Sequence, residues 1–507
     1  MRVAPVAANR WHLAAILALM AVVVFVYLPF FNAFAVPYPD FFQYRENALW
    51  YLQGRLPEYF KRLPLFPVLL GLVSLGMPGP EPELLAAELL NLLLAPVCLW
   101  LLYRIACRFV SQASAMIVVA VFALNRTMVY AAAQPNVEMV LLAAVLATID
   151  LAQQNSAWAY AAAFLASLTR FDAALIIPFV ALKDCLSCSG TRRIKSLLWA
   201  ALASVGVAVW LVLSLRHSPL TSSYAEELST RTGNPADFVK GLLAITAEAL
   251  PGYATWPSPV IWVTALIELA LIAAGSWVLL QRQRLSAILF FGFGCTYTLI
   301  HTLFPSYLDR YVFPVLWIGY LAIAAAVEQA VALTRPRAGK ARRWINAWIV
   351  ALLAGVMTSA NLAASIRFMQ SDYVRTKRAT FRQVGQWYRT TAQAEDKLIV
   401  TLWRVVGYYS GPHAGQVVHS GWVNATSVGE LVDELTDQGV TYVVCDNVYN
   451  RSDTYDSRRY KGYLLALLKT NYSDTLELVK RFKVGAEEAI VYRFHPPLRR
   501  FHPRAQP

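Results

Sequence analysis

The sequence predicts a mainly α-helical protein, a polytopic membrane helix bundle followed by a C-terminal α/β domain. Of its 507 residues, 57% are hydrophobic and only 15% are charged, whereas soluble domains average about 45–50% and roughly 25%. After residue 367, long apolar runs give way to short ones between polar stretches. The net charge of +14 fits Lys and Arg gathered in cytoplasmic loops, so we expect no nucleic-acid partner.

Apolar runs long enough to cross a bilayer, roughly 17–25 residues each, recur about eleven times. The predicted spans lie near 12–31, 84–103, 113–131, 136–153, 157–169, 171–187, 195–215, 258–280, 285–304, 311–333 and 344–366. The segment 157–187 has an alternative interpretation as one long helix. That helix would place Arg170 and Asp172 at mid-bilayer, where charges are costly.

The basic residues of the loops orient these spans. With the N-terminus inside, the loops rich in Lys and Arg fall on the inner side, at 104–108, 183–195, 282–284 and 335–343. Cytoplasmic loops carry this excess in membrane proteins. A single span at 157–187 would move basic loops outside, so two short spans are favoured. Arg170 then lies at the outer surface, and the C-terminus is outside.

The beginning of the chain has two interpretations. Ala33-Phe34-Ala35 has the small-x-small form of a signal-peptidase site, so cleavage after Ala35 is one of them. The preceding apolar run is longer than a usual signal core, which favours an uncleaved span. Cleavage leaves the remaining topology unchanged.

Three domain-level segments follow from these patterns. Residues 1–367 form the predicted membrane domain with a first outer loop at 32–83, residues 368–494 a soluble domain, and residues 495–507 a tail. In the soluble part, short β-rich runs at 397–403, 441–447 and 488–494 alternate with helical spacing at 426–438 and 459–470. Strands alternating with helices indicate an α/β domain.

The six cysteines show no disulfide framework. Cys185 and Cys188 form one C-x-x-C, but no second pair follows. A lone pair is weak evidence for zinc or redox chemistry, so neither a metal site nor a cofactor is indicated.

Polar residues from four predicted outer loops meet one surface. They are Asp40, Glu46, Lys61 and Arg62; Gln134, Asn136 and Glu138; Arg170 and Asp172; and Asp309, Arg310 and Tyr311. Ionisable groups at membrane depth usually mark a site or a pathway. A carboxylate is suited to act as general base, and arginine or lysine to bind a phosphate.

Each of these residues also has a structural interpretation. Asp40 suits the N-cap of a short helix, and Glu138 suits a cap of its own span. Arg170 has Asp172 as an ion-pair partner, as Arg310 has Asp309. Lys61 and Arg62 suit interfacial anchoring. The charges alone therefore indicate an outer-face site without separating an enzyme from a transporter.

Three segments together carry a family resemblance. The first is an Asp-led amphipathic stretch after the first span, containing Asp40, Tyr44 and Gly54, followed by "KRLPLFPVLLGL". The second is the hairpin ending in "LTRFDAALIIP", and the third is "DRYVFPVLWIGYLA". In order and spacing the chain resembles the GT-C membrane glycosyltransferases, in the family 39-like branch of protein O-mannosyltransferases and lipid A aminoarabinose transferases. Phe171 departs from it, because relatives often have Pro there.

The resemblance implies roles position by position. Asp40 matches the catalytic carboxylate, and Glu138 matches a second acidic position of the family, so these two are the expected catalytic residues. The residues implied to bind the donor phosphate and sugar are Lys61, Arg62, Arg170, Arg310, Tyr311, Tyr44 and Glu46. This branch is not thought to need a metal ion. The first loop has one clear Asp where many relatives have an adjacent acidic pair, so the role of Glu46 stays open.

The resemblance also implies the partners and the location. The donor would be a sugar on a polyprenyl phosphate, which reaches an outward-facing site through the bilayer. The acceptor would be lipid A, a lipid-linked glycan or a protein hydroxyl, with inversion at the sugar. The protein would lie in a bacterial inner membrane with its C-terminal domain in the periplasm. The rival hypothesis is a flippase or transporter of lipid-linked saccharides, against which stand the absence of internal repeats and of matching broken spans.

Overall fold

The computed structural model describes residues 10–58, 60–217, 258–302, 309–334, 340–450 and 461–497. The chain divides into two compact units. The first consists of Met1–Asn32 and Tyr44–Met369, and the second of Ala33–Gln43 and Gln370–Pro507. A short early segment thus belongs with the C-terminal part of the chain, and the division falls inside one helix, α2.

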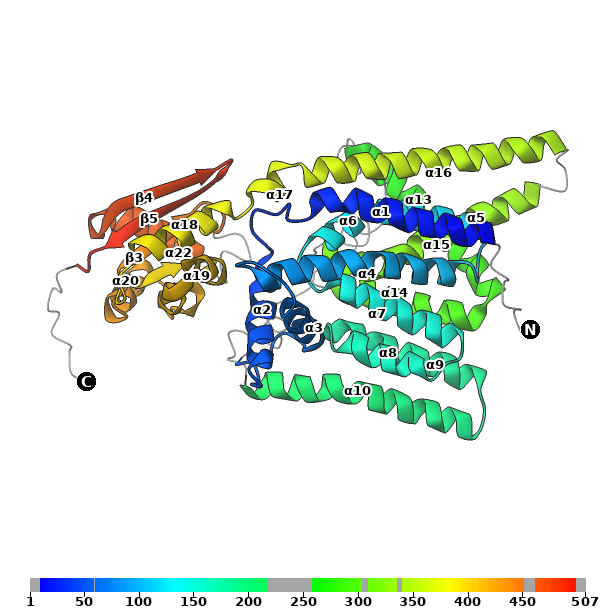
Figure 1. Ribbon diagram of the computed structural model, residues 1–507, viewed down its shortest axis with the longest axis horizontal. Helices are drawn as coiled ribbons and strands as arrows, with labels where there is room; N and C mark the ends of the chain where they lie inside the picture. Colours follow the sequence, from blue (N-terminus) through cyan, green and yellow to red (C-terminus); the bar gives the residue numbers. More distant parts are fainter. Residues whose placement is uncertain are drawn as a thin grey trace. The chain divides into compact units, whose positions relative to one another are not determined.

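The first unit is helical, and a helix lies in every segment predicted to span the membrane. Its helices are α1 (Arg10–Tyr27), α2 (Pro39–Leu52), α3 (Leu65–Ser74), α4 (Pro82–Ala106), α5 (Gln112–Ala123), α6 (Arg126–Ala133), α7 (Glu138–Gln153), α8 (Trp158–Ser167), α9 (Ile176–Ser187), α10 (Thr191–His217), α13 (Ser258–Arg282), α14 (Arg284–Thr302), α15 (Asp309–Thr334) and α16 (Lys340–Met369). Helices α7, α8, α9 and α10 pack in succession, each against the next (Figure 1).

The protein is a multi-pass membrane protein. Within the residues that the structure describes, five helices are long and apolar enough to cross a membrane, or six if one bent pair counts as a single span. Large apolar side chains point outward from them, including Phe25 at 75% exposure and Trp277 at 64%. Such exposure suits lipid rather than water. The larger number of about eleven crossings stays a prediction.

The span predicted at 113–131 is bent in the structure, and its crossing of the membrane stays a prediction. Helices α5 and α6 meet at an angle of 60°. Asn125 lies at the break, where its side-chain oxygen accepts a hydrogen bond from the Thr127 N–H at 2.8 Å. Asn competes with the helix in this way because its short side chain bonds to nearby backbone groups.

The segment 157–187 forms two helices, as favoured above. A short 3-10 helix, η2 (Phe171–Leu175), joins α8 to α9. Arg170 therefore precedes this 3-10 helix and Asp172 lies in its first turn, so neither residue is inside an α-helix. With 10 residues, α8 rises about 15 Å, which is less than a bilayer core. The crossing of the membrane by this pair stays a prediction.

The second unit contains a five-stranded sheet in the order β2-β1-β3-β5-β4. Its strands are β1 (Leu398–Val400), β2 (Val417–His419), β3 (Tyr442–Asp446), β4 (Leu476–Val484) and β5 (Glu487–Phe494). Strands β2, β1 and β3 are parallel, whereas β5 and β4 are antiparallel to their neighbours. The three predicted strands are confirmed, and β2 and β4 were missed.

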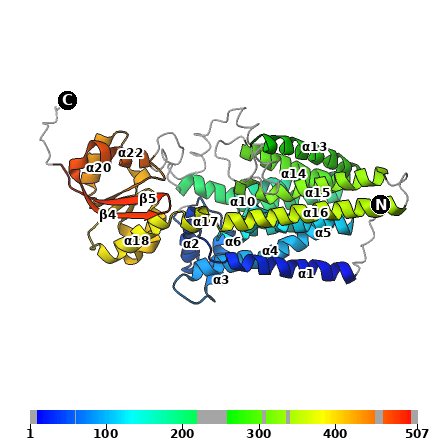
Figure 2. The same ribbon diagram turned by 90° about the horizontal axis from the view of Figure 1, so that it is seen from above.

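Helices cover both faces of this sheet. Figure 2 shows α18 (Ala379–Thr391) on one side and α20 (Val428–Asp437) with α22 (Gly462–Asn471) on the other. The latter two helices confirm the spacing seen at 426–438 and 459–470. Leu431 and Leu435 of α20 pack with Leu465 of α22 against Val443 of β3 in one buried core. An α/β domain is therefore present in the C-terminal part of the chain.

Candidate active site

Arg170 and Asp172 project from the turn after α8. Thr169 is buried and its hydroxyl donates to the carbonyl of Ala166 at 2.6 Å, which closes the end of the helix. The backbone of Arg170 is then extended, with φ −150° and ψ 143°, before η2 begins. This extended residue separates α8 from η2, and Asp172 lies in the first turn of η2.

A bidentate ion pair joins these two residues. The Arg170 Nε lies 3.1 Å from Asp172 Oδ1, and Nη2 lies 2.6 Å from Oδ2. From α14, the Tyr297 hydroxyl donates to Asp172 Oδ2 at 3.2 Å, and His301 Nε2 lies 2.8 Å from the same oxygen. Tyr297 and His301 reach one carboxylate together because residues four apart share a helix face.

Aromatic rings pack around the ion pair of Arg170 and Asp172. The Arg170 guanidinium lies 4.8 Å from the ring centre of Tyr311, at the start of α15. The His301 ring stacks on Tyr311 at 4.9 Å with an interplanar angle of 10°. We call Arg170, Asp172, Tyr297, His301 and Tyr311 the Arg170 cluster. Only 16% of the Arg170 side chain is exposed, so charges act here in a lower dielectric than water.

Glu138 lies next to the Arg170 cluster. It is the buried first residue of α7, and its carboxylate interacts electrostatically with Tyr297. The preceding loop is fixed by Asn91 of α4, whose amide donates to the carbonyls of Gln134 at 2.6 Å and Asn136 at 3.2 Å. Asn91 and this loop therefore define the position of Glu138.

The segment that carries Lys61 and Arg62 adjoins the same turn. The Leu65 N–H donates to the Leu168 carbonyl at 3.0 Å, two residues before Arg170. Phe60 and Leu63 form a small apolar core to which Leu168 also contributes. Lys61 is buried beside them. The structure thus brings the turn of Arg170 and the Lys61–Arg62 segment together.

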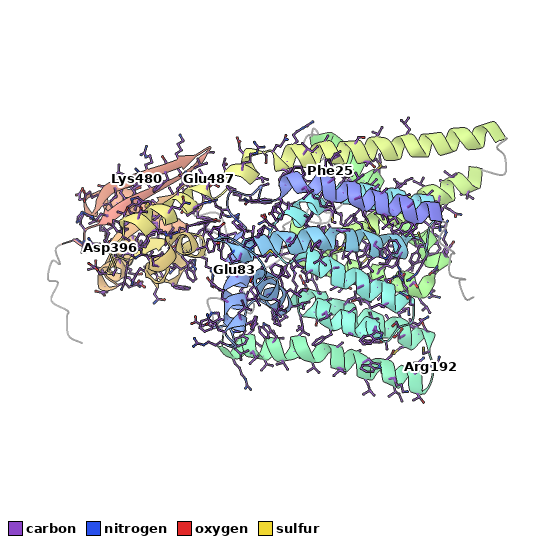
Figure 3. All side chains as sticks on the ribbon, viewed as in Figure 1. Phe25, Glu83, Arg192, Asp396, Lys480 and Glu487 are labelled. Atoms are coloured by element: carbon purple, nitrogen blue, oxygen red, sulfur yellow. The ribbon has the colours of Figure 1, made fainter. Side chains whose placement is uncertain are left out.

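Tyr44 and Glu46 come from α2. The Arg62 guanidinium lies 5.2 Å from the Tyr44 ring centre, and Tyr44 also contacts Phe66 edge-to-face at 5.0 Å. Glu46 is half-buried. Their neighbour Arg45 forms an ion pair of 3.2 Å with Glu83. Glu83 lies at the start of α4 and is labelled in Figure 3.

Asp40 belongs to the second unit. It is half-buried and is the second residue of α2, which begins at Pro39. The N-cap is the residue before the helix, so the interpretation of Asp40 as the cap is wrong, although an acidic residue in the first turn still favours the helix dipole. Its membership of one site with residues of the first unit stays a prediction. The side chain of Arg310 lies outside the described residues.

Sequence reasoning missed Tyr297 and His301. Both lie in an apolar run, "GCTYTLIHT", where ring residues look like ordinary helix packing. Their spacing of four, close to the predicted outer end of that run, was the available signal. In the part of the chain that the structure describes, no three His, Cys, Asp or Glu side chains gather as a metal site would require.

No family model matches the sequence, and no curated protein is similar to it in sequence. Solved structures do match. ArnT from Cupriavidus metallidurans in the apo state superposes with a TM-score of 0.60 and 13% identity, over 95% of this chain and 98% of that chain. The same enzyme bound to undecaprenyl phosphate gives 0.57 and 14%, over 96% and 98%.

An archaeal oligosaccharyltransferase is similar as well. AglB from Archaeoglobus fulgidus, in complex with an inhibitory peptide and a dolichol-phosphate, gives a TM-score of 0.57 at 11% identity, over 95% of this chain and 74% of that chain. The chain has the GT-C fold. The predicted resemblance is therefore confirmed for the fold, over nearly the whole length of the chain.

Proposed function

We propose that the protein is an integral-membrane glycosyltransferase that transfers a sugar from a polyprenyl-phosphate donor to a periplasmic acceptor. The observation that carries the proposal is the buried Arg170 cluster, next to Lys61 and Arg62, within a GT-C fold that extends over 95% of the chain. The structures of ArnT with undecaprenyl phosphate and of AglB with dolichol-phosphate support a lipid-linked donor.

The cationic residues would bind the phosphate of the donor. Lys61 is a buried point charge, and Arg62 and Arg170 offer planar guanidinium groups that match phosphate oxygens. Asp172 fixes the orientation of Arg170 through Nε and Nη2, which leaves Nη1 outside the ion pair. A preorganised cation of this kind stabilises the charge that develops on a departing phosphate. Arg310 is proposed for the same task.

The chemical step needs a base and a leaving group. Asp40 would take the proton of the acceptor hydroxyl as its oxygen attacks the anomeric carbon. The bond from that carbon to the phosphate oxygen breaks, and the polyprenyl phosphate leaves with both electrons. In-line attack inverts the anomeric centre. Glu138, beside Tyr297, and Tyr44 with Tyr311 would line the sugar subsite, and Glu46 is proposed to contact the sugar.

The proposed orientation follows the basic loops. The N-terminus would be cytoplasmic and the C-terminal domain periplasmic, in the inner membrane of a bacterium. Apolar residues around a charged site suit a donor that reaches the site through the bilayer. The acceptor would be lipid A, a lipid-linked glycan or a protein hydroxyl.

Lipid mass spectrometry tests the proposal on cells with the wild-type chain, Asp40→Asn, Asp433→Asn or no chain. Asp433 is an exposed aspartate of α20, so Asp433→Asn is the matched control. We expect one polyprenyl-phosphate sugar to accumulate alike in Asp40→Asn cells and in cells without the chain, because a general base contributes about 10²–10⁴-fold in rate. If no such lipid rises while Asp40→Asn is folded at the wild-type level, the proposal is wrong and the transporter hypothesis gains.

A further inference from the structure

The segment Ala33–Gln43, which carries Asp40, is built into the C-terminal unit. The Ala35 N–H donates to the Val374 carbonyl at 3.5 Å. In the other direction, Nη1 of Arg382 in α18 donates a hydrogen bond to the Ala35 carbonyl at 3.2 Å. Residues separated by 347 positions in the sequence thus fix the main chain five residues before Asp40.

Aromatic contacts continue this attachment on both sides of Asp40. Two residues before it, the Tyr38 ring lies 4.8 Å from the Arg378 guanidinium. Two residues after it, the Phe42 ring lies 5.1 Å from the ring of Tyr408 in α19 (Trp403–Ser410). Phe42 is 2% exposed, whereas Asp40 stays half-buried. The contacts therefore hold the backbone on either side of Asp40.

Arg378 is itself held in an unusual conformation. Its φ is +65°, in the left-handed region that side chains other than glycine rarely adopt. Its N–H donates to Glu487 Oε2 at 2.6 Å, at the start of β5, where Figure 3 labels Glu487. The Arg378 residue is also buried. Such conformations persist where the surroundings determine them, and they gather at functional sites.

We propose that Arg378 is a positioning residue, which holds Tyr38 and thereby the first turn of α2 with the carboxylate of Asp40. The C-terminal domain then serves the reaction by fixing the base, in addition to any contact with the acceptor. A planar guanidinium suits this role better than a lysine ammonium, because it can stack on the aromatic ring as well as attract it electrostatically. The proposal rests on the proposed function for the role of Asp40, but the attachment itself does not.

Hydrogen exchange on the full chain in detergent tests the attachment without any substrate. We expect Arg378→Ala to exchange about tenfold faster over residues 33–43, with Arg378→Lys intermediate. The matched control is Arg493→Ala, because Arg493 contacts the Tyr442 ring at 5.8 Å in the same domain. Its side chain contacts Tyr442 rather than the segment 33–43. Tyr38→Leu removes the same contact from the other side and replaces Arg378→Ala if that variant fails to fold.

Transfer kinetics then test the positioning role. Misplacement of a reacting group by about 1 Å costs about 10²-fold in rate, so we expect kcat to fall toward that extent in Arg378→Ala while KM for the donor stays within about threefold. Unchanged exchange over 33–43 overturns the attachment, and faster exchange with unchanged kcat overturns the positioning role. A wild-type chain without transferase activity, but with faster exchange in Arg378→Ala, refutes the proposed function and leaves the attachment standing.

Discussion

The two ends of α7 carry different polar networks built around the same kind of ion pair. At its start, Glu138 adjoins the Arg170 cluster. Near its other end, buried Asp150 pairs with Arg108 at 2.8 Å and Arg104 at 3.2 Å. Glu138 and Asp150 are about 18 Å apart along the helix, at 1.5 Å per residue.

The difference lies in what surrounds each carboxylate. Asp150 receives two guanidinium groups from α4 and its flanking loop and the Gln154 amide at 2.8 Å, so it links the ends of neighbouring helices. Asp172 receives one guanidinium from its own turn and two aromatic residues from α14. In the Asp150 network, the arginine and amide groups bond to the carboxylate. In the Arg170 cluster, the guanidinium also lies beside the Tyr311 ring. Burial of a charge does not distinguish these roles, but the neighbours of the charge do.

The largest effect that tests this comparison is expected for Arg170→Gln. Glutamine keeps a hydrogen-bond donor for Asp172 but removes the cation, and losing one preorganised group costs about 10²–10³ in rate. Turnover of a lipid-phosphate sugar by purified protein is the measurement. Arg108→Gln is the matched control, since it makes the same change at the other end and should keep its activity per folded molecule. An equal loss in both variants would erase the functional difference between the two networks.

The second effect is on stability, for Asp150→Asn. Hydrogen bonds to a charged group contribute about 1.5–3 kcal/mol, and this change weakens those from Arg104 and Arg108. We expect a lower thermal midpoint in detergent and little change in turnover at a temperature where both proteins are folded. A variant as stable as wild type, or one that loses turnover first, would contradict a purely structural role for Asp150.

A third buried carboxylate, Asp446 of β3, sharpens the comparison because its hydrogen-bond donors are neutral. Thr401 Oγ1 donates to Oδ2 at 2.8 Å, and the N–H groups of Val448 and Tyr449 donate to Oδ1. Burial raises the pKa of this carboxyl above its usual range, and the three hydrogen bonds only partly oppose the change. Asp150 and Asp172 have arginine partners, whereas these three donors to Asp446 are a hydroxyl and two backbone N–H groups.

The pH dependence of stability follows from that pKa. A carboxyl whose pKa is higher in the folded state contributes stability fully below its unfolded pKa of about 3.9, and this contribution is lost as pH rises through the folded pKa. This is the smallest of the three expected effects. As the pH rises from the unfolded pKa of Asp446 through its folded pKa, we expect the thermal midpoint of the wild type to decline and that of Asp446→Asn to decline less. Asp433→Asn should keep the wild-type profile. Identical profiles for wild type and Asp446→Asn would contradict the inference.

Sequence reasoning located the helices well, because apolar runs of fixed length leave few alternatives in a membrane. It missed the break at Asn125, since one polar residue in an apolar run does not reveal whether it caps a new helix. It also grouped Arg170, Glu138 and Tyr311 on one predicted surface, and the structure places Arg170 and Tyr311 in one cluster with Glu138 beside it. The GT-C fold followed from several weak motifs taken together.

The contacts of Tyr297 and His301 with Asp172 could not be predicted from the sequence. Tyr297 and His301 lie 125 and 129 residues from Asp172, and only the folded chain brings them to its carboxylate. The same holds for Asp40, whose segment was assigned to the membrane part because it follows the first span directly. Spacing arguments work along one helix or strand, and they lose force where distant segments meet.

The discontinuous second unit has a consequence for synthesis of the chain. Residues 33–43 leave the ribosome first, while Arg382 follows 347 residues after its partner Ala35. At about 5–20 residues per second, the early segment waits roughly 20–70 s for the domain that receives it. Long-range pairing of this kind is slow to form and costs loop entropy. A nascent chain that stops before residue 370 therefore carries an Asp40 helix without the domain that anchors it.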